Sequence, residues 1–141
     1  AENRTDADLA KLRDLANAFN ETIVKAVPLD IMQANFAFHI AVSEAGKNPY
    51  VTRHYRELLS EARRLLHMHV QVLDTVARKE VMQDQHQDFI DAVAAQDIAQ
   101  ADAIAHAHTM QFHDRFLKAL QHTPASGFDI GLSTASVKAA Q

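Results

Sequence analysis

The 141-residue sequence contains no cysteine and no tryptophan, and it has only three glycines and three prolines. Without cysteine the chain has no disulfide scaffold, no thiolate metal site and no thiol nucleophile. With so few glycines, loops that cradle phosphate are not expected, and no P-loop, G-x-S-x-G, G-x-G-x-x-G or H-E-x-x-H sequence occurs. The scarcity of turn-forming residues predicts long helices joined by few connections.

Charge and hydropathy exclude further classes of protein. The net charge is −4 and the isoelectric point is near 6.1, which makes the domain by itself a poor binder of nucleic acid. No apolar run approaches the roughly 20 residues that span a bilayer. The chain opens with the polar stretch AENRTDAD instead of a signal peptide. We therefore expect a single cytoplasmic domain, large enough to enclose a core and without a membrane partner.

Apolar residues recur at helical spacing in five segments, and nothing alternates as in a strand. A capping box formed by Thr5 and Asp8 starts the first segment, and Gly46 is the expected C′ residue after the second. The helices expected in chain order run from Thr5 to Pro28, from Pro28 to about Ala45, from Asn48-Pro49 to about Val76, from about Glu80 to Ala95, and from Asp97 to about Gln121.

The connections between these helices are short, so the pattern predicts an all-α antiparallel helical bundle over residues 1–122. The expected core stripe of the first helix is Leu9, Leu12, Ala16, Phe19 and Ile23. The expected stripe of the third helix includes Val51, Tyr55, Leu58, Ala62, Leu65 and His69, widened by Leu59 and Leu66. Residues 123–141 carry no stripe and are rich in Gly, Ser and Thr, which predicts a loosely held or disordered tail.

Four polar residues interrupt the apolar stripes: Asn35, His39, His86 and His108. His86 precedes Asp97 by as many residues as His108 follows it, so an antiparallel hairpin turning at Asp97 places both imidazoles at one level. Asn35 and His39 lie one turn apart on another helix, the spacing at which two side chains hold one ion. Three imidazoles and one oxygen that converge inside a bundle predict a site for Zn²⁺ or a similar divalent metal.

The alternative is that these histidines are hydrogen-bonded residues of an ordinary core, and the pattern alone leaves both interpretations open. His69 lies in the stripe of the third helix and either lines the same cavity or packs in the core. Arg63, on the flank of that stripe, is either an anchor for an anion or an exposed side chain. The remaining histidines are expected on flanks or surfaces: His54, His67, His106, His113 and His122.

Two motifs resemble a known family. The residues Asn35-Phe36-Ala37-Phe38-His39 followed by Ala45-Gly46-Lys47-Asn48-Pro49 resemble the segment D-x-x-F-H … A-x-x-N-P of FCD domains. The second match consists of His86, Ala92, Asp97, Ala101 and His108, which follow the pattern H-x5-A-x4-D-x3-A-x6-H. FCD domains are the effector-binding C-terminal domains of FadR-type regulators in the bacterial GntR family, and the resemblance covers about Thr5 to Leu120.

The resemblance implies a helical bundle that binds a small organic acid, with a divalent metal held by one Asp and three His. His39, His86 and His108 match the three histidines, and Asn35 stands at the Asp position. Because Asn brings no negative charge, the metal (Zn²⁺ or Ni²⁺) is expected to bind more weakly than in the family. If no metal is present, the acid meets the imidazoles directly. Arg63 and His69 are the expected effector-binding residues.

The family usually carries a winged helix-turn-helix ahead of this segment, so we expect an isolated effector domain whose DNA contacts belong to that other domain. Homodimerisation is also implied by the resemblance. The leading hypothesis is therefore the ligand-sensing domain of a bacterial transcriptional regulator, with no catalytic residue. Two alternatives are a metal-dependent hydrolase or lyase on a helical bundle, and a purely structural helical domain.

Overall fold

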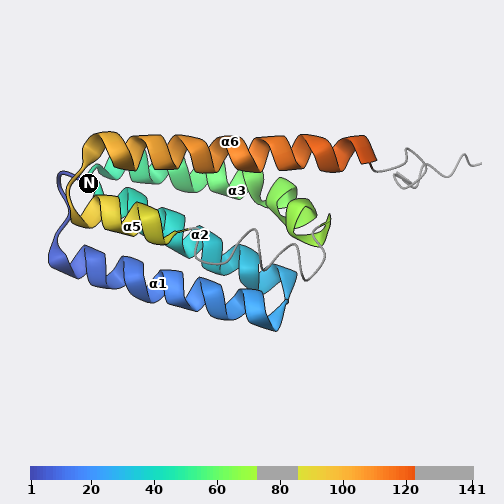
Figure 1. Ribbon diagram of the computed structural model, residues 1–141, viewed down its shortest axis with the longest axis horizontal. Coiled ribbons are helices and arrows are strands. Elements are labelled where there is room, and N and C mark those ends of the chain that lie inside the picture. Colours follow the sequence, from blue (N-terminus) through green and yellow to red (C-terminus); the bar gives the residue numbers. More distant parts are fainter. Residues whose placement is uncertain (73–85, 123–141) are drawn as a thin grey trace, which may run out of the picture.

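The computed structural model describes residues 1–72 and 86–122 (Figure 1). This part of the chain consists of α-helices without strands, which confirms the all-α expectation. The helices are α1 (Asp6–Lys25), α2 (Pro28–Ala45), α3 (Pro49–Val72), α5 (Gln87–Ala94) and α6 (Ile98–His122). Parts of two expected helices, residues 73–76 and 80–85, and the expected tail over residues 123–141 lie outside the described residues.

The helices form a ring in which each one packs against two others, in the order α1, α2, α3, α6, α5 and back to α1 (Figure 1). The short turns Ala26-Val27 and Gly46-Asn48 connect the first three helices, and the pair α5 and α6 closes the ring as the expected hairpin. A ring of amphipathic helices turns its apolar faces to a shared interior. No described helix combines the length and the apolar character that a bilayer span requires.

Local capping explains where the helices begin. The Thr5 hydroxyl accepts a hydrogen bond from the Asp8 amide (3.2 Å), and the Asp8 carboxylate accepts one from the Thr5 amide (2.7 Å), which confirms the capping box. Asn48 accepts from the amides of Tyr50 and Val51 at the start of α3. Asp97 likewise accepts from the Gln100 amide at 2.9 Å, so the predicted N-caps Thr5, Asn48 and Asp97 are confirmed, whereas the start predicted at about Glu80 lies outside the described residues.

The end of α2 differs from the sequence expectation by one residue. Gly46 has right-handed torsions (φ −70°), and it is Lys47 that takes the left-handed conformation (φ 56°). Gly46 suits its position for another reason, because a Cβ atom there would approach the Ser43 carbonyl to 3.2 Å. The Lys47 ammonium donates to the Asp8 carboxylate at 2.7 Å, and this bond is the main reason that the pKa of Asp8 is lowered to about 2.

The predicted core stripe of α1 is confirmed, because the five residues predicted for it are the buried residues of that helix. On α3 the prediction was wrong for Val51, which is 55% exposed, and for Leu58, which is 62% exposed, whereas Leu59 next to Leu58 is buried. The two positions differ by about 100° around the helix. Packing of α3 against both α2 and α6 turns the Leu59 side inward, and spacing within one helix cannot resolve such a rotation.

The N-terminal segment is attached to the end of α5. The Arg4 guanidinium donates to the carbonyl oxygens of Val93 (3.3 Å) and Ala94, and the Gln96 side-chain amide donates to the Glu2 carbonyl at 3.0 Å. The last carbonyls of a helix lack partners within the helix, and Arg4 supplies one to Ala94, whereas the Val93 carbonyl also accepts from the Gln96 backbone amide at 3.2 Å. The short helix α5 is thereby fixed at its end to residues that precede the bundle.

Candidate metal centre

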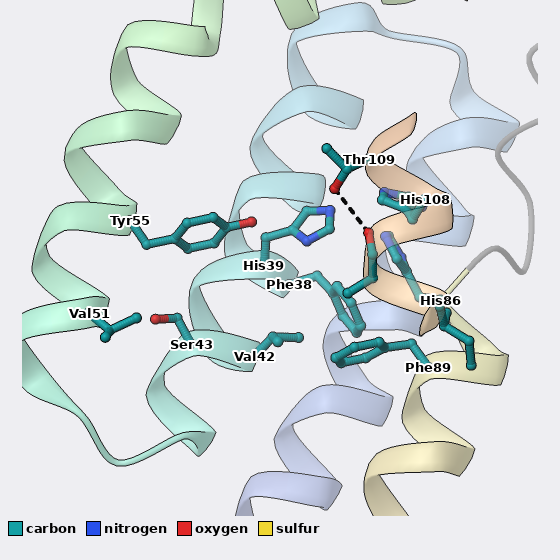
Figure 2. A pocket seen from close by; sticks show the side chains of 12 residues that line it. Phe38, His39, Val42, Ser43, Val51, Tyr55, His86, Phe89, His108 and Thr109 are labelled. Atoms are coloured by element: carbon teal, nitrogen blue, oxygen red, sulfur yellow. Dashed lines mark hydrogen bonds between the residues drawn. The ribbon is translucent and has the colours of Figure 1, made fainter. Parts of the chain in front are cut away.

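Three imidazoles meet in the interior of the helix ring (Figure 2). His39 extends from α2, His86 is the N-cap residue of α5, and His108 lies on α6. Their ring centroids are separated by 5.3 Å (His39 to His86), 5.2 Å (His39 to His108) and 5.6 Å (His86 to His108). One ring nitrogen of each lies within 4.8 Å of the other two, a spacing at which a single metal ion can bind all three.

The imidazole of His86 is the most enclosed of the three. It is 4% exposed, and the ring of Phe38 stacks on it with centroids 3.9 Å apart, while Phe19 packs against it at 4.7 Å. Within the described part of the chain, neither of its ring nitrogens has a hydrogen-bond partner. A buried polar group without a partner costs about 1 to 3 kcal/mol, and a metal ion bound to one nitrogen would remove the cost at that nitrogen only. The residues present therefore fit a metal.

Burial also sets the protonation state. Loss of hydration is the main cause that lowers the pKa of His39 to about 3 and that of His86 to about 2, and the neighbouring imidazoles act in the same direction. Both rings are therefore neutral at pH 7, which is the form that binds a metal. A neutral ligand set leaves the charge of a bound divalent ion uncompensated by these side chains.

The other predicted site residues take different places. Asn35 is buried (8% exposed) on α2, one turn before His39, but it is not among the described residues that line the cavity beside the imidazoles. Arg63 is exposed on α3 and does not line this cavity either, because its position on the helix faces outward. The side chain of His69 lies outside the described residues. His54, His106 and His113 are exposed, as expected.

A cavity of about 260 Å³ lies directly beside the three imidazoles. Besides the histidines, its described lining consists of Phe38, Val42, Ser43, Val51, Tyr55, Phe89, Ile104, Ala105 and Thr109. Val51, Ala105 and Thr109 are exposed, so the cavity opens to solvent between α3 and α6. The sequence interpretation missed Ser43 and Thr109, although Ser43 follows His39 by one helical turn and Thr109 is adjacent to His108.

A comparison with protein families shows that residues 1–112 fit the family model described as FCD domain. The match includes both motifs singled out in the sequence and all three histidines of the site. Comparisons with curated proteins and with solved structures give no significant match.

The stability of the metal-free chain should depend on pH through these imidazoles. Unfolded histidines bind protons near pH 6.5, whereas the folded His39 and His86 resist protonation down to about pH 3 and 2. The unfolded state therefore binds more protons as the pH falls. The free energy of unfolding should fall between about pH 6.5 and 5, by up to about 1.4 kcal/mol per pH unit for each ring.

Urea titrations in EDTA measure this dependence in a range above that in which most carboxylates titrate. His106→Gln, a change at an exposed histidine, should keep the slope. A stability that stays flat from pH 6.5 to 5 would contradict the burial of the two rings.

His108→Ala should abolish most of the zinc-induced rise in Tm. Loss of a direct ligand weakens metal binding by more than the roughly 10- to 100-fold typical of a supporting residue. His106→Ala is the matched control, because it lies about 200° around the same helix and is exposed. Calorimetric melting with Zn²⁺ and with EDTA gives the comparison. If the rise persists in both His108→Ala and His86→Ala, the ligand assignment is wrong.

Proposed function

Because the chain belongs to the FCD domain family, whose members are effector-binding domains of GntR-type regulators, we propose that it senses a small organic acid. The acid binds beside a divalent metal held by His39, His86 and His108. The observation that carries this proposal is the convergence of three ligand nitrogens within 4.8 Å of one another, next to a cavity that opens to solvent. The family is regulatory, so the proposal assigns no catalytic residue.

The ligand chemistry favours Zn²⁺ or Ni²⁺, since both prefer imidazole nitrogen. Asn35 is the fourth protein ligand in this proposal, offering its amide oxygen from one turn before His39. With four neutral ligands the ion keeps its full positive charge, which attracts a carboxylate to an open coordination position. The carboxylate supplies the negative charge that an Asp at position 35 would have provided.

The helix α5 is the element through which the site acts in this proposal. His86 stands at its first turn, and Arg4 holds the carbonyls of its last turn. A ligand that binds one placement of α5 more tightly than another shifts the chain toward that placement, together with the attached N-terminal segment. A winged helix-turn-helix domain N-terminal to this segment and a second copy of the chain complete the proposed regulator, which acts in the cytoplasm.

Carboxylates should bind the chain only when metal is present. We expect that at least one member of a panel of acetate, benzoate, succinate and citrate raises the Tm of the zinc-loaded chain and leaves it unchanged in EDTA. The matching neutral amides, acetamide and benzamide, should have no effect because they carry no charge. If none of the acids shifts the Tm, or if the shifts are equal in EDTA, the proposed function fails.

Asn35→Asp should tighten zinc binding by at least about tenfold, because a carboxylate attracts the ion and an amide does not. Without zinc the same variant should melt at a lower temperature, since a buried charge then lacks a partner. Gln33→Glu makes the same chemical change at an exposed position of α2 and should alter neither quantity. Competition titration with a zinc chelator measures both variants, and equal or weaker affinity of Asn35→Asp would show that residue 35 does not face the ion.

A further inference from the structure

We propose that the cavity selects an acid with one carboxylate and a compact apolar body, and that the Tyr55 hydroxyl holds the second oxygen of that carboxylate. This inference rests on the proposed function, because it assumes that the first oxygen binds the metal. It goes further by naming the class of effector and a residue that determines specificity.

The wall of the cavity away from the imidazoles is apolar and comes from four helices. Phe38 and Val42 line it from α2, Phe89 from α5 and Ile104 from α6. Val51 of α3 stands at the rim, where it is 55% exposed. A second charged group placed against these side chains would lose its hydration and find no partner among them, whereas an aromatic or branched aliphatic body would bury apolar surface on both sides.

The volume of the cavity limits the size of that body. About 260 Å³ is just below the roughly 300 to 1,000 Å³ of typical small-molecule pockets, which suits a small acid. Benzoate and branched six- or seven-carbon acids are small acids with a compact apolar body. Acetate fills only the part next to the imidazoles and leaves the apolar wall without contacts.

Tyr55 lies on α3 opposite the histidines, and Figure 2 shows its hydroxyl pointing toward His39. Burial raises the pKa of Tyr55, so the phenol stays protonated at neutral pH and can donate a hydrogen bond. The other two hydroxyls of the described lining already donate elsewhere. Thr109 donates to the Ala105 carbonyl (2.9 Å), and Ser43 donates to the Thr52 hydroxyl (3.1 Å).

Among the described lining residues, the Tyr55 hydroxyl therefore remains as the neutral donor that points toward His39 (Figure 2). A carboxylate bound to the ion through one oxygen would have its other oxygen free, and in this proposal the Tyr55 hydroxyl holds that oxygen. A hydrogen bond to a charged acceptor is among the stronger ones in proteins, so its loss is measurable.

Calorimetric titration of the zinc-loaded chain tests the effector class with three acids. Benzoate has the charge and the apolar body, acetate has the charge alone, and succinate has a second charge in place of an apolar body. We expect benzoate to bind at least tenfold more tightly than either of the others. Val42→Thr, which adds a hydroxyl to the wall at nearly constant volume, should weaken benzoate several-fold and leave acetate unchanged.

Tyr55→Phe removes only the hydroxyl and should weaken benzoate and acetate alike, by about tenfold or more, without changing the affinity for zinc. The matched control is Tyr50→Phe, because Tyr50 lies on the same helix, is 77% exposed and does not line the cavity. Unchanged Kd values in Tyr55→Phe would overturn the role of this residue.

The failure of this inference is distinguishable from the failure of the proposed function. Succinate binding that equals or exceeds benzoate binding would overturn the selection of an apolar acid and would still leave a metal-dependent acid sensor. If none of the three acids binds the zinc-loaded chain, both the inference and the proposed function are wrong.

Discussion

The rest of the site depends on one constraint: the imidazole of His86 is a polar ring buried in an apolar core. It lies in the core between Phe19 and Phe38, and neither of its nitrogens has a partner within the described structure. The aromatic contacts fix the plane of the ring, so a nitrogen faces the point that His39 and His108 also reach. A metal ion there would give that nitrogen a partner, so metal binding and folding stability would be two measures of one interaction.

The ring of helices encloses the cavity that leads to the three imidazoles. The three histidines come from α2, α5 and α6, whereas α3 contributes Tyr55 and Val51 to the opposite wall of the cavity. The helix α5 has a special position, because its first turn touches the site and its last turn is held by Arg4. The eight residues of α5 separate His86 from the carbonyls that Arg4 contacts.

Much of this arrangement could be predicted from the sequence, because periodicity and capping are local. The stripe of α1, the capping box at Thr5 and the approach of His86 to His108 follow from spacing along one helix or one hairpin. The wrong predictions concern side-chain orientations and backbone torsions that packing between helices determines. Packing decides that Leu59 and not Leu58 turns inward and that Lys47 takes the left-handed torsion. For Arg63, the pattern left an anion anchor and an exposed side chain open, and the residue is exposed. The sequence did not indicate that Ser43 and Thr109 line the cavity, because a small polar residue on a helix has no periodic signal of its own.

The central claim is that one metal ion joins the three imidazoles, and a crystal of the chain grown with Zn²⁺ tests it most directly. Diffraction on both sides of the zinc absorption edge shows where the ion lies. We predict one strong anomalous peak inside the helix ring, with a nitrogen of His39, His86 and His108 each at about 2.0 to 2.1 Å. Electron density that shows the three rings apart, or a zinc peak confined to exposed histidines, would contradict the account.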